Sequence, residues 1–146
     1  MAQIKRIMCV CIGNSDRSPV MAAVLEMFLK NAGYEVGCTS VGISESANRG
    51  GGASPFAVTA AKRIGIDLTG HGRTQIASHG LDYYGLIICA SDEIAAKVIE
   101  LGADPKKVYN AQIPNPWPVQ FQEDYDVTFA QILAAMYRVV ARYFSQ

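Results

Sequence analysis

The chain has 146 residues, a length typical of one domain, and half of its residues are hydrophobic, which is enough to build a core. Thirteen basic residues balance thirteen acidic ones, and the lack of a basic excess argues against a general nucleic-acid-binding or membrane-binding surface. We therefore expect a single domain over residues 1–146, with no nucleic acid and no membrane among its partners.

The N-terminal segment and the cysteines both favour a cytoplasmic protein. Residues 1–6 lack the long apolar stretch and the cleavage site of a signal peptide, and no apolar run is long enough to cross a bilayer. The four cysteines form neither a Cys-x-x-Cys zinc pattern nor a dense disulfide framework: Cys9, Cys11, Cys38 and Cys89. We expect a reducing compartment, and a protein without metal or cofactor.

In chain order, the first predicted element is a strand over residues 4–10, which is rich in apolar and β-compatible residues and stops at a Gly-Asn pair. Ser18 then offers an N-cap, and Pro19 occupies the first helical position, where its missing N–H costs nothing. Apolar residues repeat at helical spacing from there until Gly33, a natural helix stop.

The pattern of strand followed by helix then recurs. Further strands are predicted over residues 36–41, 86–90 and 108–110, and further helices over residues 54–65, over residues 91–101 and from about residue 124 onward. Strands that alternate with helices imply a parallel sheet covered on both faces. The predicted fold is α/β, with one four-stranded parallel sheet, helices on both faces and a phosphate-binding loop after the first strand.

The junction between the first strand and the first helix predicts an anion site. In parallel α/β sheets, ligands bind at the carboxyl ends of the strands, and a loop that leads into a helix points its backbone N–H groups and the helix dipole at one spot. Gly13 allows a tight curl, Asn14 tolerates left-handed geometry, and Arg17 supplies a planar fork for two phosphate oxygens. The predicted phosphate-binding residues are Ile12, Gly13, Asn14, Ser15, Asp16 and Arg17.

Cys11 ends the strand and would lie at the floor of this loop. The field that binds phosphate also favours a thiolate, and a thiolate beneath phosphate-binding donors can attack phosphorus in line. The alternative is a buried cysteine at a strand end and a surface arginine, because Cys-x5-Arg alone is a weak signal. The strand before it, the Gly-Asn pair inside it and the Ser-Pro helix start after it favour the phosphate loop.

Val10 to Asn14 and Arg17 to Pro19 resemble the signature of the low-molecular-weight protein tyrosine phosphatases, and the resemblance extends over nearly the whole chain. Weaker matches support it: Thr39 to Gly42, the His71 and Gln75 pair, Ile87 to Cys89, and Ile113 to Trp117, which falls where the family has an Asp-Pro motif. The resemblance implies a hydrolase without metal or cofactor. Its substrates would be phosphotyrosine proteins or small aryl phosphates, and it would bind oxyanions such as phosphate or sulfate.

The resemblance also implies roles for individual residues. Cys11 would be the nucleophile, forming a phosphocysteine, and Arg17 would bind the phosphoryl group. Ser18 would hydrogen-bond the thiolate. The polar network that holds the loop would consist of Asn14, Ser18, Ser40 and His71.

Asn115 is the main departure from the family, because it stands where the family has its general acid, an aspartate before proline. An amide cannot protonate a leaving phenolate or activate water, and such catalysis is worth about 10²–10⁴-fold. The sequence therefore predicts an impaired enzyme. One alternative is a pseudophosphatase that binds phosphotyrosine without releasing product efficiently. A thiol-dependent arsenate reductase is disfavoured, since it needs two further cysteines in a disulfide relay.

Asp16 is the second departure, because the family usually has a second cysteine directly before the arginine. A carboxylate there would disfavour the thiolate and weaken anion binding, and we expect it to turn outward into solvent. It could instead take over proton transfer from Asn115. Asp124 and Asp126 are rival replacements, although either could simply be a favourable charge at a helix N-terminus.

Trp117, the only tryptophan, follows Asn115 and is predicted to form the pocket wall against which a substrate ring stacks. Tyr83 and Tyr84 could do the same, or could pack as partly buried rings. The glycines at 50–52 lie where the family has its substrate-facing loop.

Overall fold

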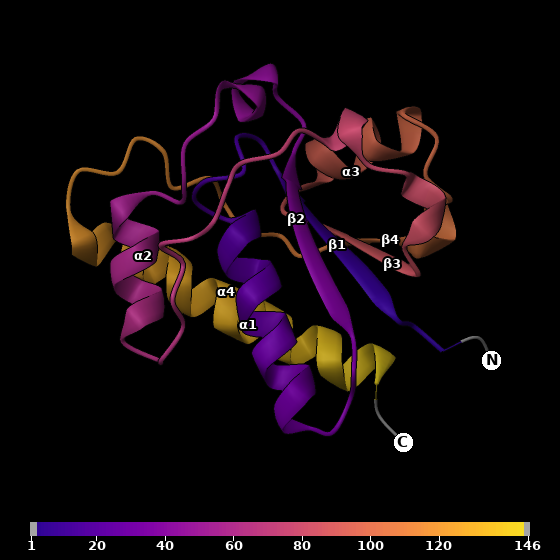
Figure 1. Cartoon of the computed structure of the whole chain (residues 1–146), viewed down its shortest axis with the longest axis horizontal. Coiled ribbons are helices and arrows are strands. Elements are labelled where there is room, and N and C mark those ends of the chain that lie inside the picture. Colours follow the sequence, from indigo (N-terminus) through magenta and orange to yellow (C-terminus); the bar gives the residue numbers. More distant parts are fainter. Residues whose placement is uncertain (1–2, 145–146) are drawn as a thin grey trace.

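One parallel sheet of four strands forms the centre of the computed structural model, which describes residues 3–144 (Figure 1). The strands are β1 (Arg6–Cys11), β2 (Gly37–Gly42), β3 (Leu86–Cys89) and β4 (Val108–Asn110), in the spatial order β2-β1-β3-β4. All neighbouring pairs are parallel, as predicted. Residues 1 and 2 of the N-terminal segment, and residues 145 and 146 of the predicted domain, lie outside the described residues.

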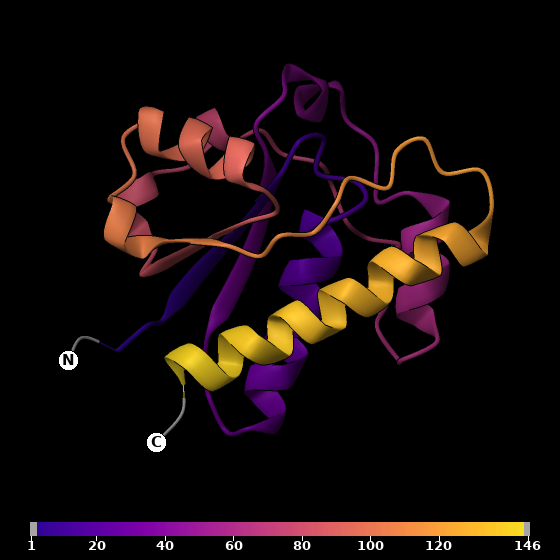
Figure 2. The same ribbon diagram turned by 180° about the vertical axis from the view of Figure 1, so that it is seen from behind.

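Helices cover both faces of this sheet. They are α1 (Ser18–Asn31), α2 (Pro55–Lys62), α3 (Asp92–Glu100) and α4 (Gln122–Tyr143). The β1-α1-β2 and β3-α3-β4 crossovers lead to opposite edges of the sheet, so their right-handed connections place α1 and α3 on opposite faces. The long helix α4 packs against α1 and α2, and Figure 2 shows it crossing in front of α1 in that view. The predicted fold class is confirmed.

Strand β1 is the most deeply buried part of the sheet. Its residues from Ile7 to Cys11 are buried without interruption, because β1 has a strand on each side and helices over both faces. A continuous apolar run of this kind is typical of a parallel strand covered on both sides.

The carboxyl ends of three strands meet at one edge of the sheet. In the strand register, Cys11 lies beside Gly42 of β2, and Val10 lies beside Cys89 of β3. The chain leaves β1 toward β2 on one side, while β3 lies on the other, so this edge is the topological switch point at which α/β sheets bind ligands. The loop that begins at Cys11 therefore stands at the expected place.

The start of α1 differs from the sequence-based expectation. Ser18 is the first helical residue rather than the N-cap, Arg17 takes the cap position, and no side chain caps the helix. The Ser18 hydroxyl is committed to hydrogen bonds beneath the loop, which keeps it away from the helix N–H groups. Pro19 is therefore the second helical residue and not the first, still within the turn where its missing N–H costs nothing. The other predicted elements differ from the structure by one to three residues at their ends: β1 begins and ends later than predicted, β2 begins one residue later, α2, β3 and α3 are shorter, and α4 begins at Gln122.

Helix α4 is the longest helix of the described chain, with 22 residues. Its solvent-facing side carries charged residues, among them Glu123, Asp124 and Arg142. Between residues 3 and 144, no helix combines the length and the apolar character needed to cross a membrane.

Gly42 is predicted to be indispensable at the end of β2, because a Cβ atom there would lie 2.6 Å from the Ile12 carbonyl oxygen and 3.0 Å from the Asn14 nitrogen. We expect Gly42→Ala to lower the free energy of unfolding by about 1–3 kcal/mol through overpacking against this backbone. The measurement is urea denaturation. Gly37→Ala is the control on the same strand, since no atom lies within 4 Å of its added Cβ, and it should change stability by no more than about 0.5 kcal/mol. Equal losses in the two variants would contradict the prediction.

Candidate active site

The first turn of the loop is anchored by the chain that follows β2. The Cys11 carbonyl accepts a hydrogen bond from the Ile43 N–H at 3.0 Å, and the Ile12 carbonyl accepts one from the Ser44 N–H at 2.9 Å. These bonds continue the β1–β2 pairing past the end of the sheet. They turn both carbonyl groups away from the interior of the loop.

The second half of the loop is held by three other segments. The carbonyls of Asn14, Ser15 and Asp16 each have a partner outside the loop. These partners are the Nε2 atom of His71 at 3.0 Å, the N–H of Ser54 at 3.1 Å and the hydroxyl of Tyr125. The loop is therefore tied to the segment around His71, to the start of α2 and to α4.

Outward carbonyls imply inward N–H groups. All peptide bonds of the loop are trans, and in a planar trans peptide the C=O of one residue and the N–H of the next point in opposite directions. The N–H groups of residues 12, 13, 15, 16 and 17 therefore converge inside the loop, and none of them has a partner between residues 3 and 144. Together with the N-terminus of α1, they form a cradle for an oxyanion.

Asn14 holds the loop from within. It is completely buried, and its φ of 58° places it in the left-handed region, whereas Gly13 does not adopt a positive φ. The Asn14 Nδ2 donates to the hydroxyls of Ser18 at 2.9 Å and Ser40 at 3.0 Å, and its Oδ1 accepts from the Thr74 N–H at 2.9 Å. The curl is therefore made by the asparagine, whose side-chain hydrogen bonds to Ser18, Ser40 and Thr74 hold its left-handed backbone in place.

Cys11 lies beneath the cradle, with only 2% of its surface exposed. Its Sγ is 2.9 Å from the Ser18 Oγ, which also lies 3.2 Å from the Val41 carbonyl oxygen. The Asn14 amide already donates to this hydroxyl, so its own hydrogen is available for either neighbour. When Cys11 is a thiolate, the hydroxyl can donate to the sulfur, which stabilises the negative charge.

The other three cysteines occupy a different chemical setting. Burial raises the pKa of the Cys9 thiol well above its ordinary value, and it raises those of Cys38 and Cys89 to about 12. These thiols stay protonated at neutral pH, and all four cysteines are free. Cys9 and Cys89 are completely buried within strands, an arrangement that does not suit the disulfide relay of an arsenate reductase.

Arg17 links the loop to the segment around Asn115. The side chain is almost fully buried, and its Nη1 donates to the Ile113 carbonyl at 2.8 Å. Burial lowers the pKa of the guanidinium, while the charges of Cys11 and Asp16 act in the opposite direction. An arginine remains protonated under these conditions, so the site keeps a fixed positive charge beside the sulfur.

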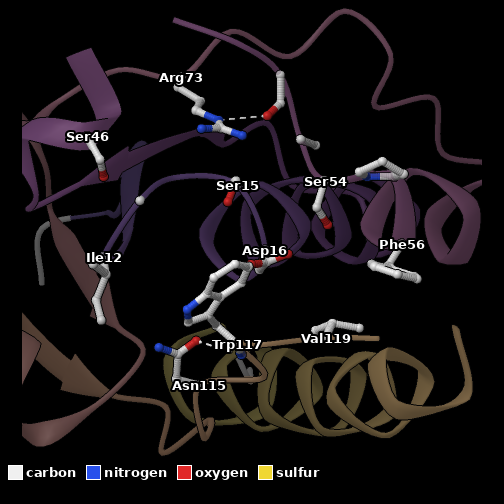
Figure 3. A pocket seen from close by; sticks show the side chains of 14 residues that line it. Ile12, Ser15, Asp16, Ser46, Ser54, Phe56, Arg73, Asn115, Trp117 and Val119 are labelled. Atoms are coloured by element: carbon white, nitrogen blue, oxygen red, sulfur yellow. Dashed lines mark hydrogen bonds between the residues drawn. The ribbon is translucent and has the colours of Figure 1, made fainter. Parts of the chain in front are cut away.

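A cavity of about 550 Å³ opens over the loop (Figure 3). Trp117, with 72% of its surface exposed, and Asn115 form one side of it, and the Asn115 Oδ1 accepts the Trp117 N–H at 3.2 Å. The start of α2 forms another side. The lining residues include Ile12, Ser15, Asp16, Ser54, Phe56 and Arg73.

A family model described as low molecular weight phosphotyrosine protein phosphatase matches residues 6–138. The chain belongs to this family. The resemblance seen in the sequence is thereby confirmed, and with it the hydrolase class of the protein. No curated protein sequence matches the chain.

Solved structures of phosphatases share this architecture. Wzb from Vibrio vulnificus, in complex with benzylphosphonate, is 25% identical, with a TM-score of 0.83 over 95% of this chain and 99% of that one. Wzb from Escherichia coli K30, in complex with sulphate, is 21% identical, with a TM-score of 0.82 over 96% and 99%. The low molecular weight protein tyrosine phosphatase from T. tengcongensis is 19% identical, with a TM-score of 0.85 over 94% and 99%. The last two show the common fold.

Asp16 does not turn outward into solvent in this phosphatase, contrary to the expectation from the sequence. It is half-buried and lines the cavity together with Asn115 and Trp117 (Figure 3). The Tyr125 hydroxyl fixes the Asp16 carbonyl on the outer side of the loop, which leaves the side chain on the cavity side. The direction of the Asp16 side chain thus depends on a hydrogen bond from Tyr125, which lies 109 residues further along the chain.

Tyr83 and Tyr84 are not part of the cavity wall. The Arg6 guanidinium lies 4.5 Å from the centre of the Tyr83 ring, at the opposite end of β1 from the loop. Tyr84 is buried, and its hydroxyl lies 3.5 Å from the Nδ1 atom of His79. Tyr84 is therefore a packing residue, as the alternative interpretation expected, whereas Tyr83 is 66% exposed and is neither a cavity residue nor a buried ring.

Sequence reasoning missed three residues of the site. Thr74 holds the Asn14 amide, Tyr125 holds the Asp16 carbonyl, and Arg73 lines the cavity while its Nε donates to the Gly52 carbonyl at 2.9 Å. Thr74 lies between the two members of the His71–Gln75 pattern, which could have drawn attention to it. Arg73 lies within the same pattern, whereas Tyr125 had no local signal. Across residues 3–144, no group of three or more His, Cys, Asp or Glu side chains is arranged to hold a metal ion.

The hydrogen bonds of the Asn14 side chain predict a large loss of stability when this side chain is shortened. Asn14→Ala removes three side-chain hydrogen bonds and leaves alanine in a left-handed conformation, so we expect a loss of about 2–4 kcal/mol in stability and weaker sulfate binding. Urea denaturation and calorimetric titration with sulfate measure the two effects. The matched control is Gln112→Ala, because Gln112 also has a positive φ, of 54°, but is exposed. Comparable losses in both variants would show that backbone strain alone is responsible.

Proposed function

We propose that this phosphatase hydrolyses phosphomonoesters of phenols, phosphotyrosine or small aryl phosphates, through a phosphocysteine on Cys11. One observation carries the proposal: five carbonyl groups of the loop that begins at Cys11 are bonded to partners outside it, which leaves five N–H groups to face an oxyanion within the loop. The fixed charge of Arg17 and the hydroxyl of Ser18 complete the electrostatic setting.

In the first step, the Cys11 thiolate attacks phosphorus while the loop N–H groups hold the phosphoryl oxygens. An S–P bond forms as the bond to the phenolic oxygen breaks, opposite the sulfur. The Arg17 guanidinium balances the charge on the phosphoryl group, and Ser18 stabilises the thiolate before attack and after release. Water then cleaves the S–P bond and gives inorganic phosphate.

Ligands of related proteins support the substrate class. Benzylphosphonate, bound by Wzb of Vibrio vulnificus, joins an aromatic ring to a phosphonate group, and sulphate, bound by Wzb of Escherichia coli, is a tetrahedral oxyanion. Here Trp117 stands exposed at the mouth of the cavity, in a position to stack on a substrate ring.

Asn115 supports a second candidate function, a module that binds phosphotyrosine without efficient release. Its amide can donate a hydrogen bond to the leaving oxygen, but it cannot transfer a proton. Turnover of p-nitrophenyl phosphate, whose phenol departs readily without protonation, separates the two functions. A phosphatase turns over this ester many times, whereas a binding module releases at most about one p-nitrophenolate per chain.

Cys11→Ser is expected to reduce hydrolysis of p-nitrophenyl phosphate by more than about 10³-fold, because a hydroxyl without an adjacent base is a poor nucleophile. The cradle consists of backbone N–H groups, so sulfate should still raise the melting temperature of this variant. Cys89→Ser serves as the control that keeps Cys11. If Cys11→Ser keeps an activity near that of the wild type, Cys11 is not the nucleophile.

A further inference from the structure

The proposed hydrolysis needs a proton donor that Asn115 cannot supply, and only a carboxyl group within the cavity could replace it. Three aspartates are close enough in sequence to the loop or to the segment around Asn115 to be considered: Asp16, Asp124 and Asp126. Their positions in the fold differ sharply.

Asp126 and Asp124 are both unsuited to this task. The Asp126 carboxylate accepts hydrogen bonds from Arg63 at 2.8 Å and Gln122 at 3.0 Å, and these bonds lower its pKa, so that the acid form is disfavoured. Asp124 is exposed in the first turn of α4. Neither residue lines the cavity over the loop.

Asp16 meets the geometric requirement. Its N–H is one of the five that converge inside the loop, so its backbone lies at the rim of the cradle, while its side chain lines the cavity (Figure 3). Cys11 and the core lie beneath the loop, so a leaving group can depart only through the cavity. The leaving oxygen therefore passes the edge of the loop, where the Asp16 side chain lines the cavity.

The backbone of Asp16 is also held firmly enough to position the carboxyl group. The carbonyl before it, that of Ser15, accepts from the Ser54 N–H, and its own carbonyl accepts from Tyr125. Two helices, α2 and α4, thus fix the two peptide groups that flank this one side chain.

The polar groups around Asp16 have hydrogen-bond partners other than its carboxyl group. Arg17 donates to Ile113, Tyr125 is a neutral phenol whose pKa is raised by burial, and Arg73 lines the same cavity but donates to Gly52. Neither of the two ion pairs within residues 3–144 involves Asp16.

We propose that Asp16 is the general acid and base of this phosphatase, in place of the residue at position 115. The inference rests on the proposed function. As the S–P bond forms and the P–O bond breaks, the Asp16 carboxyl group gives its proton to the phenolic oxygen and becomes a carboxylate. In the second step, this carboxylate takes a proton from water as the water oxygen attacks phosphorus and the Cys11 thiolate departs. Each cycle consumes one ester and one water, and restores the acid form of Asp16 and the thiolate.

The test compares leaving groups of different basicity. With phenyl phosphate, whose phenolate is a poor leaving group, Asp16→Asn should lower kcat/KM, which reports on the first step, by about 10²-fold or more, whereas with p-nitrophenyl phosphate the loss in kcat/KM should be below about tenfold. The matched control, Asp124→Asn, should leave both rates unchanged. Circular dichroism melting confirms that each variant is folded.

A second variant makes the test independent of any general damage to the loop. Adding Asn115→Asp to Asp16→Asn introduces a carboxyl group on the other side of the cavity, and it should restore at least about tenfold of the phenyl phosphate rate. The same change in the wild type should gain much less, since an acid is already present. The pH profile for phenyl phosphate should lose, in Asp16→Asn, the fall in kcat at high pH that marks a required acid.

Three outcomes would overturn the assignment. An unchanged or higher rate in Asp16→Asn would mean that the carboxylate only opposes the substrate charge. An equal loss with both esters, without rescue by Asn115→Asp, would mean that Asp16 only supports the loop. If the wild type fails to turn over p-nitrophenyl phosphate although sulfate binds, the proposed hydrolysis is itself wrong, and the role of Asp16 falls with it.

Discussion

The left-handed conformation of Asn14, with a carboxamide that bonds in three directions, is the feature on which the rest of the site depends. Its Nδ2 holds the hydroxyls of Ser18 and Ser40, and its Oδ1 holds the N–H of Thr74. The reversal of the chain at this residue lets the carbonyls on both sides turn outward, and so lets the N–H groups turn inward. Because the residue is completely buried, each of its polar atoms needs a partner, and these partners lie on three separate segments.

The sheet makes this arrangement possible by bringing distant segments to one edge. Parallel pairing aligns the ends of β1 and β2, so that Ile43 and Ser44 can bond the first loop carbonyls. The close approach requires Gly42, where a Cβ atom would collide with the Ile12 carbonyl. The site thus depends on strand register as much as on the residues of the loop, and its rigidity comes from the core beneath it.

The charge distribution of the site is unusual for an oxyanion cradle. Arg17 and the helix N-terminus attract an anion, whereas Asp16 brings a negative charge to the same cavity. A carboxylate so close to bound phosphate weakens binding unless it carries a proton or takes part in the chemistry. Asn115, which lines the same cavity, has no charge and contributes only hydrogen bonds. The two departures from the family pattern therefore meet in one cavity.

The sequence by itself determined the order and type of the elements, because hydrophobic periodicity is a local property of the chain. It also determined the phosphate loop at Cys11 to Ser18 and the family, because the spacing of Cys11, Asn14 and Arg17 is local as well. It identified Ser40 and His71 only through resemblance. Tertiary structure alone decided the direction of Asp16, the partners Thr74 and Tyr125, and the use of Ser18 beneath the loop instead of at a helix cap. Each of these depends on a contact between residues far apart in sequence, whose geometry is set only when strands and helices pack around the edge of the sheet.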